Sequence, residues 1–319
     1  MSLIIKKPGI LTTVQDLGRS GAQRFGVNSN GVMDSAAARL LNAALGNHES
    51  DAVLEMHFPA PVIEFDTDSD VAIGGADFSA ELDGEPVRNW SRRPIEKGAV
   101  LSFKKRVTGN RAYLAVRGGI EVDEWLGSRS TNTTAAIGGY YGRRLNAGDM
   151  VACRAESLGS SEVIIGSSVI PRYSRFPTVR VIPANEFDIL TPAGERVFVS
   201  EGFTLTRDCD RMGYRLSGKP LEVIDSGPMV SAGVNFGTIQ LLPDGQLIIL
   251  MADHQTSGGY PRIGNVIATD LPLLAQCGPG DGVSFELVSV GDAEHLALEF
   301  DQQLNMLRVG CRLRNYDAH

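Results

Sequence analysis

Glycine is the sequence feature that most constrains this fold. The chain has 36 glycines in 319 residues, where an average composition of about 7% would give roughly 22. They separate short runs of Val, Ile, Leu and Phe, in places as turn pairs such as Asp83-Gly84 and Asp244-Gly245. Because Asp-Gly between two apolar runs favours a tight turn, the pattern predicts a mainly β protein of the β-rich α+β type with few helices.

The apolar runs give the expected strands. The hairpin over 238–251, around Pro243-Asp244-Gly245, carries the clearest turn signal. The candidate strands are 53–56, 62–65, 71–73, 100–103, 112–116, 197–200, 238–242, 247–251 and 283–288.

Two segments have helical patterns instead. Asp34 is a suitable N-cap for a helix over 35–45, which is rich in Ala and Leu and ends at Gly46-Asn47. A second helix is expected over 292–307, where Leu296, Phe300 and Leu304 recur every four residues. By default, both apolar stripes are expected to pack on a core.

The chain is long enough for two ordinary cores, and 43% hydrophobic with 21% charged residues is typical of a globular protein. A small polar stretch and a proline-flanked crossing between 153 and 179 indicate a boundary. We therefore expect a β-rich N-terminal domain over 1–160, which holds the loop 12–19 and one helix. A C-terminal domain over 175–310 and a tail over 311–319 complete the expectation.

Charge and hydropathy exclude several classes of partner. The formal net charge is −8 and the pI about 5.2, which argues against nucleic acid because phosphate binding requires clustered Lys and Arg. No stretch approaches the roughly 20 apolar residues of a membrane span, and the N-terminus lacks a signal-peptide core. We expect no membrane partner and a cytoplasmic protein.

Several kinds of catalytic site can also be excluded. The segment 213–220 has the glycines and lysine of a phosphate loop, but Pro220 occupies the position of the Mg²⁺-binding hydroxyl. The histidines and cysteines lack metal-ligand spacing, so no metal site is expected. The segment 127–131 lacks the closing glycine of a serine nucleophile elbow, and no biotinylation motif is present. ATP or biotin is therefore expected on a partner.

Two polar, glycine-rich runs remain, 12–19 followed by 31–34, and 251–262. Carboxylates that can accept a proton and amides that can hold a planar amide group make four candidate catalytic residues; these are Gln15, Asp16, Asp253 and Gln255. Arginines beside glycine-rich turns can grip a carboxylate with a bidentate fork; these candidate substrate-binding residues are Arg19, Arg211 and Arg262. We expect the two runs to converge.

Each candidate also has a structural alternative. The arginines can cap loops or pair with Asp208 and Asp210. Asp34 is sufficiently explained as an N-cap, and Asp16 as the brace of a turn. Asp253 follows an apolar strand, where rigid scaffolds often present catalytic groups.

Six motifs along the chain carry a resemblance to a known family: 12–19, 31–34, 127–131, 210–216, 237–240 and 253–261. In these motifs the chain resembles, nearly from end to end, the allophanate hydrolase subunit 2 proteins, also called KipI antagonist (KipA) or the C subunit of 5-oxoprolinase. Two small departures bear on substrate choice. The chain has Asn30-Gly31-Val32-Met33-Asp34 where the family commonly has Gly-Gly-Ala-Met-Asp, and Ser257 where threonine is frequent. The matched motifs also add Asp34, Gln240 and Tyr260 to the candidate substrate-binding residues.

The resemblance implies two cyclophilin-like β-barrel domains and a heterocomplex with a KipI-like B subunit. In one branch, subunits A, B and C open 5-oxo-L-proline to L-glutamate with ATP. In another, fused homologues form the carboxyltransferase part of a biotin-dependent urea carboxylase, in the allophanate hydrolase system. We expect an amidohydrolase subunit of the first kind, inactive alone, that acts on a small amide. The alternatives are a carboxyltransferase served by biotin on a separate carrier, and a non-enzymatic KipI-binding regulator of a histidine kinase.

Overall fold

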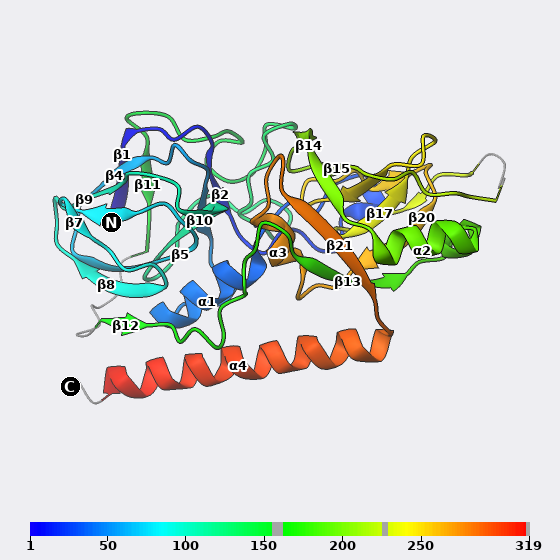
Figure 1. The fold of residues 1–319 in the computed structure, drawn as a ribbon. Coiled ribbons are helices and arrows are strands. Elements are labelled where there is room, and N and C mark those ends of the chain that lie inside the picture. Colours follow the sequence, from blue (N-terminus) through cyan, green and yellow to red (C-terminus); the bar gives the residue numbers. More distant parts are fainter. Residues whose placement is uncertain (155–161, 225–228, 317–319) are drawn as a thin grey trace. The chain divides into compact units, whose positions relative to one another are not determined.

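A computed structural model describes residues 1–154, 162–224 and 229–316. The chain divides into two compact units (Figure 1). Unit 1 comprises Met1–Arg19, Asn30–Pro171 and Phe300–His319, and unit 2 comprises Ser20–Ser29 and Arg172–Glu299. The short Ser20–Ser29 segment is thus grouped with the C-terminal unit although it lies between two N-terminal motifs.

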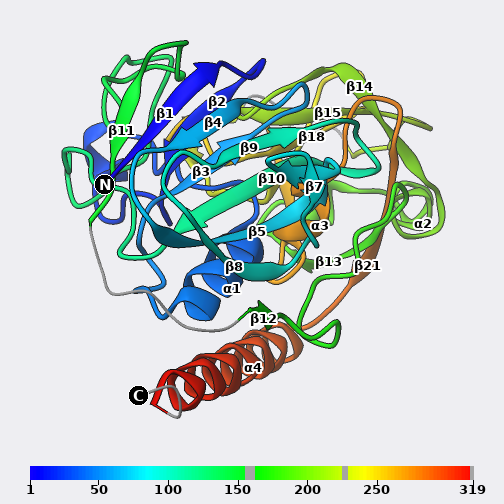
Figure 2. The same ribbon diagram turned by 90° about the vertical axis from the view of Figure 1, so that its left-hand side faces the viewer.

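Unit 1 builds its core between two sheets, which Figure 2 shows stacked above α1. Buried Leu3, Phe65 and Leu101 from one sheet share a hydrophobic cluster with Leu54 and Leu114 from the other. In the described part of the unit, the first sheet has the order β11 (Met150–Ala152), β1 (Ser2–Lys7), β4 (Val62–Phe65), β9 (Val100–Phe103), β6 (Ala80–Leu82), β7 (Glu85–Pro86). The second has the order β12 (Val163–Ile164), β8 (Ser91–Ile95), β5 (Ser69–Asp77), β10 (Thr108–Val116), β3 (Val53–Met56), β2 (Thr12–Gln15).

Helix α1 (Ser35–Leu45) confirms the first helix prediction at both ends. The Asp34 carboxylate accepts the amide hydrogen of Ala37 at 2.8 Å, and Gly46 ends the helix with a left-handed φ of 78°. The buried alanines and leucines of α1 face β5 and β10. Local signals therefore determine this helix and fix the main chain that follows the motif 31–34.

Unit 2 contains a closed barrel, which confirms the mainly β expectation. Strands β13 and β21 pair in parallel, and the remaining barrel neighbours pair antiparallel. The predicted hairpin is present as β17 and β18. The barrel order is β13 (Thr178–Pro183), β20 (Arg262–Val266), β17 (Thr238–Leu241), β18 (Leu247–Leu250), β15 (Gly213–Ser217), β14 (Phe203–Cys209), β21 (Gly282–Leu287).

Shorter elements surround the barrel within unit 2. Strands β16 (Ala232–Gly233) and β19 (Ser257–Gly258) form a separate two-stranded ribbon. The remaining short elements are the helix α3 (Leu271–Ala275) and the 3₁₀ turns η1 (Gln23–Phe25) and η2 (Phe187–Ile189).

One expected strand is wrong, because 197–200 ends the helix α2 (Pro192–Ser200). The hydroxyl of Thr191 accepts the amide hydrogen of Gly194 at 3.1 Å, and Pro192 occupies the first turn, where its missing N–H costs nothing. Phe198 is fully buried and stacks on Phe285 at 4.7 Å. Capping and the burial of one face thus outweigh the strand preference of the two valines.

Helix α4 (Val290–Tyr316) is longer at both ends than the predicted 292–307. Of the predicted stripe, Leu304 is buried, whereas Leu296 and Phe300 are half-buried. Among the described helices, none combines the length and the apolar character needed to cross a bilayer.

Candidate functional site

Asp16, which directly follows β2, is the centre of a closed polar cluster in unit 1. Its Oδ1 accepts hydrogen bonds from the hydroxyls of Ser128 at 2.6 Å and Ser130 at 2.5 Å, and from the amide of Gly18 at 2.8 Å. Its Oδ2 accepts the amide of Arg129 at 2.6 Å. The carboxylate therefore joins the motif 12–19 to the motif 127–131 and is 6% exposed.

Gln15 lies beside this cluster and is also buried. Its Nε2 donates to the hydroxyl of Thr13 and to the carbonyl of Thr131, each at 3.1 Å. Its Oε1 is buried and accepts no hydrogen bond from the residues that the structure describes, which is unusual for a buried amide. Gln15 thus holds Thr131 against β2, and its Oε1 acceptor stays unused by the described residues.

Arg19 is buried and occupied within unit 1. Its guanidinium donates to Asn30 Oδ1 at 2.7 Å, to the Ser130 carbonyl at 2.5 Å and to the Trp125 carbonyl at 3.2 Å. It also lies 4.9 Å from the centre of the Trp125 ring, in cation–π geometry. Arg19 therefore supports the Trp125 ring. Its hydrogen bond to Asn30 also joins the two residues that flank the segment 20–29.

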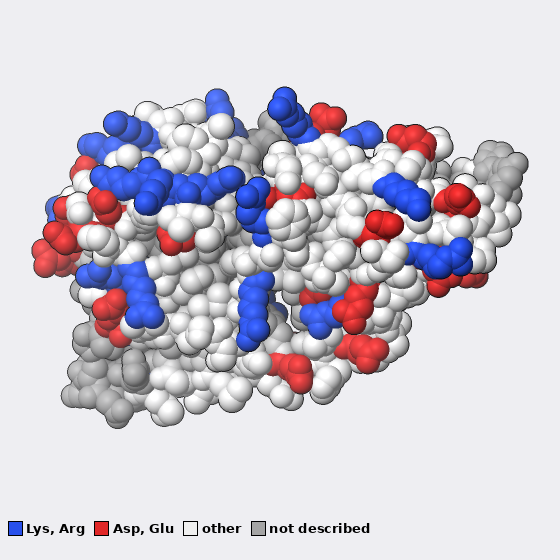
Figure 3. Space-filling model, viewed as in Figure 1, with Lys and Arg blue, Asp and Glu red and all other residues white. Residues whose placement is uncertain are grey.

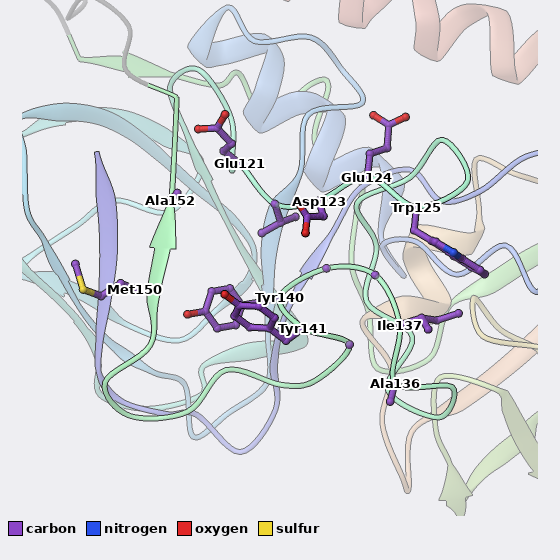
Figure 4. Close-up of a pocket in the computed structure, with 14 residues that line it drawn as sticks. Glu121, Asp123, Glu124, Trp125, Ala136, Ile137, Tyr140, Tyr141, Met150 and Ala152 are labelled. Carbon is purple, nitrogen blue, oxygen red and sulfur yellow. The ribbon is translucent and has the colours of Figure 1, made fainter.

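The supported tryptophan lines a cavity of about 550 Å³ in unit 1 (Figure 4). Figure 4 shows Asp123 pointing toward the rings of Tyr140 and Tyr141, whereas Glu124 points away. Another wall contains Gly138, where a Cβ would overlap the Ser130 carbonyl and the Arg19 guanidinium. Arg19 and Ser130, which belong to the motifs 12–19 and 127–131, thus lie directly behind the cavity wall at Gly138.

Asp34 is buried as the helix cap described above. Its amide donates to the Tyr113 hydroxyl at 2.9 Å, and that hydroxyl donates to Glu55 Oε2 at 2.8 Å. Burial, followed by the negative charges of Glu55 and Asp34, raises the pKa of Tyr113 well above its usual value. This buried network fixes the start of α1.

In unit 2, Asp253 follows β18 and forms a bidentate ion pair with Arg211. The Arg211 Nε and Nη2 atoms donate to Oδ2 and Oδ1 at 2.8 and 2.9 Å, and the Asp253 amide donates to the Arg211 carbonyl at 2.7 Å. Asn28, from the Ser20–Ser29 segment, donates its Nδ2 to the Asp253 carbonyl at 3.1 Å. Asp253 is therefore held from three directions.

The next two residues along the chain are oriented differently. His254 is fully buried, and its Nδ1 lies 2.6 Å from the Gln255 carbonyl. Burial lowers the pKa of His254, so the ring is neutral at pH 7. Because Nδ1 carries the proton that meets the carbonyl, Nε2 is an acceptor, and none of the described residues donates to it. Gln255 is exposed and lines a second cavity.

Gln240 on β17 is 1% exposed, and its Nε2 donates no hydrogen bond within the described part of the chain. A Cβ at Gly258 would overlap this nitrogen, so the ribbon strand β19 requires glycine there. Gln240 and His254 thus leave one donor and one acceptor unused in unit 2.

Arg262 and Tyr260 lie on the same stretch of unit 2. Arg262 donates to the two Glu186 carboxylate oxygens at 2.8 and 2.6 Å and to the Gly233 carbonyl at 3.0 Å. The Arg262 hydrogen bond lowers the pKa of Glu186. Tyr260 is 45% exposed. Arg262 holds the β16 end of the ribbon, whereas Tyr260 is accessible.

The predicted site residues therefore form one group in each unit. Gln15, Asp16, Arg19 and Asp34 belong to unit 1, and the residues from Arg211 onward belong to unit 2. The convergence of the two runs stays a prediction. Within its own unit, each carboxylate and each arginine of these groups is engaged by neighbours.

Several residues at these contacts and cavities are not predicted by the sequence pattern. Asn28 carries no local signal, because its partner Asp253 is 225 residues away. Trp125 and Tyr140 lie in loops whose aromatic residues alone indicate no site. Arg207 and Arg215 line the second cavity. Arg215 lies between Tyr214 and Leu216, an alternation typical of any solvent-facing strand, and Arg207 lies between Thr206 and Asp208, a polar stretch that indicates no particular site.

Neither a metal nor a nucleotide site is evident in the described ranges. They contain no cluster of His, Cys, Asp and Glu suited to a metal ion. Gly213–Ser217 is strand β15, whereas a phosphate loop precedes a helix. Acidic and basic side chains both occur on the face shown in Figure 3.

Comparison with known proteins defines the class. The family described as "Carboxyltransferase domain, subdomain A and B" matches residues 25–287, and the chain belongs to this family. It is 37% identical to the 5-oxoprolinase C subunit of Haemophilus influenzae, over 93% of this chain and 94% of the relative. It is 34% identical to the Escherichia coli protein of the same name, over 98% and 99%.

A solved structure extends the similarity to a larger enzyme. The K. lactis urea amidolyase superposes with a TM-score of 0.88 at 28% identity, covering 96% of this chain and 20% of that chain. The fold is therefore that of one segment of a urea amidolyase, and it occurs at nearly full length in bacterial 5-oxoprolinase subunits.

Proposed function

We propose that this chain is the C subunit of an ATP-dependent 5-oxoprolinase that converts 5-oxo-L-proline, ATP and water to L-glutamate, ADP and phosphate. It works with subunits A and B in the cytoplasm and is inactive alone. The observation that carries this proposal is the nearly full-length match to two relatives named as 5-oxoprolinase C subunits. The urea amidolyase match, by contrast, covers a fifth of that chain.

The residues of unit 2 suit a cyclic amide. We assign Gln255 to the amide group, because an exposed carboxamide offers both a donor and an acceptor beside a cavity. Asp253 is assigned to proton movement at the same amide, with its orientation set by Arg211. Gln15 and Asp16 act by holding the loops of unit 1 in place.

The segment 213–220 does not form a phosphate loop, because Gly213–Ser217 is strand β15, whereas a phosphate loop precedes a helix. We assign ATP binding to another subunit of the complex.

Reconstitution tests the proposal. The chain is combined with its A and B partners, and glutamate is measured with and without ATP. ATP-dependent glutamate formation is expected only with all three subunits, and an Asp253→Ala complex should lose at least about 100-fold in turnover. Wild-type turnover by that variant would remove Asp253 from catalysis. Absence of glutamate from the complete wild-type complex would contradict the function itself.

Membership of the carboxyltransferase-domain family supports a second candidate. In that case the chain transfers a carboxyl group to urea from biotin on a separate carrier protein. Activity would then require the biotinylated carrier and would stop when avidin is added. A substrate screen of 5-oxoproline against urea, each with and without avidin, separates the two candidates.

A further inference from the structure

A second cavity, of about 440 Å³, lies in unit 2 where the β14–β15 ladder is irregular. Leu205 pairs with Leu216 and Cys209 pairs with Tyr214, so β14 has two more residues than β15 between these pairs. Such bulges redirect side chains and often occur beside active sites. Here the bulged segment brings Arg207 to the cavity.

Two arginines line this cavity, Arg207 on β14 and Arg215 on β15. In the described part of the chain, neither forms an ion pair. Elsewhere in unit 2, Arg180, Arg211 and Arg262 are each bound to a carboxylate at 2.5 to 2.9 Å. The cavity arginines therefore differ from these three in keeping their donors available.

The acidic residues at the cavity do not take up these donors. Asp210 Oδ1 instead accepts the amides of Met212 at 2.7 Å and Gly213 at 3.1 Å. Asp208 also lines the cavity but lies outside ion-pair distance of either arginine. Each guanidinium has five N–H donors in a planar fork that matches a carboxylate.

The cavity also has an apolar part and a carboxamide. Met212, Ile248 and Leu250 supply apolar surface, and Gln255 supplies the carboxamide assigned above to the substrate amide. A ligand that contacts the arginines, the apolar surface and the carboxamide carries a carboxylate, a short apolar body and an amide. A lactam that bears a carboxylate has this composition, whereas urea has no carboxylate.

We propose that Arg207 and Arg215 bind the carboxylate of a small amide acid in this cavity and thereby select it against neutral amides. The identification of Gln255 as the amide contact rests on the proposed function. Carboxylate selection by the two arginines rests on the cavity itself. The arginines are specificity residues, because the bond that is broken lies at the amide.

Binding to the complex of this chain with its KipI-like partner tests the proposal by calorimetry. Three probes are compared: 5-oxoproline, 2-pyrrolidone, which is the same lactam without the carboxylate, and urea. Because a hydrogen bond to a charged group contributes about ten- to a hundredfold in affinity, 5-oxoproline is expected to bind at least tenfold more tightly than 2-pyrrolidone. Equal binding of these two probes, or no binding of 5-oxoproline at millimolar concentration, overturns the proposal.

Variants locate the effect. Arg207→Gln and Arg215→Gln are each expected to weaken 5-oxoproline binding at least tenfold and to leave 2-pyrrolidone binding unchanged, with partial retention in Arg215→Lys. Arg196→Gln is the matched control, because Arg196 is an exposed residue of the same unit outside the cavity. Unchanged 5-oxoproline affinity in both Gln variants overturns the proposal.

Turnover distinguishes this inference from the proposed function. In the complete complex, the Gln variants are expected to raise KM for 5-oxoproline at least tenfold with little change in kcat. If the complex binds 5-oxoproline through the arginines but forms no glutamate, the carboxylate site stands and the 5-oxoprolinase assignment fails.

Discussion

Arg211 and Asp253 are joined by two parallel hydrogen bonds of 2.8 and 2.9 Å, and each side chain is 10% exposed. They are 42 residues apart in the sequence. The fork fixes both carboxylate oxygens, so any proton that Asp253 accepts must arrive at an oxygen already bound by Arg211. The orientation of the Asp253 carboxylate therefore limits proton transfer as much as its basicity does.

Removing one member of this pair should destabilise unit 2. Arg211→Met is expected to lower the free energy of unfolding by about 3 kcal/mol, because it leaves a nearly buried carboxylate without its counter-charge. The measurement is urea unfolding. In an Arg211→Met, Asp253→Leu double variant part of the loss should return; a single variant as stable as the wild type would show that the pair contributes nothing.

The Asp16 cluster should be a folding determinant of unit 1. Asp16→Ala leaves two hydroxyls and two amides without their acceptor, so we expect a loss of about 3 kcal/mol in thermal or denaturant unfolding. Asp123→Ala, an exposed aspartate of the same unit, is the control and should stay within about 0.5 kcal/mol. An unchanged midpoint for Asp16→Ala would mean that these bonds do not stabilise the fold.

The parts of the fold that were predictable depend on neighbours in sequence. Asp34, the alanine-rich run and Gly46 are contiguous, and α1 has the predicted ends. The β17–β18 hairpin likewise follows from its own turn. The segment 197–200 wrongly predicts a strand because Val-Phe-Val suits both structures, and the deciding cap at Thr191 lies several residues upstream.

The roles of the candidate site residues depend on partners that are distant in the sequence. The sequence pattern therefore predicts which residues are candidates but not what each of them does. Asp16 meets Ser130 across 114 residues, and Asn28 meets Asp253 across 225. A carboxylate on a polar loop has the same sequence signature whether it binds substrate or closes a cluster. Its neighbours in space decide which, and these are absent from the local pattern.

Gly139, in the wall of the larger cavity, should tolerate no side chain. Its φ is 53°, and a Cβ would overlap the Thr131 hydroxyl. Gly139→Ala is therefore expected to cost about 3 kcal/mol, from overpacking and left-handed strain together. Gly148→Ala separates the two causes, because φ is 87° there and nothing lies within 4 Å of the added carbon; it should cost about 1 kcal/mol. Equal losses in the two variants would contradict the steric explanation.

His254 should make stability depend on pH in the mildly acidic range. Burial lowers its pKa in the folded protein from the ordinary value near 6.5, so the unfolded chain binds a proton that the folded chain refuses. The free energy of unfolding is then constant above about 6.5 and falls as the pH drops toward the folded pKa, by at most about 1.4 kcal/mol for each pH unit. His254→Gln, which cannot titrate, is expected to show a flatter profile between pH 7.5 and 5.5 in urea unfolding. Gln255→Ala, which changes an exposed neighbour without a titrating group, should keep the wild-type slope. A His254→Gln profile that parallels the wild type would place the cause of any acid sensitivity elsewhere in the chain.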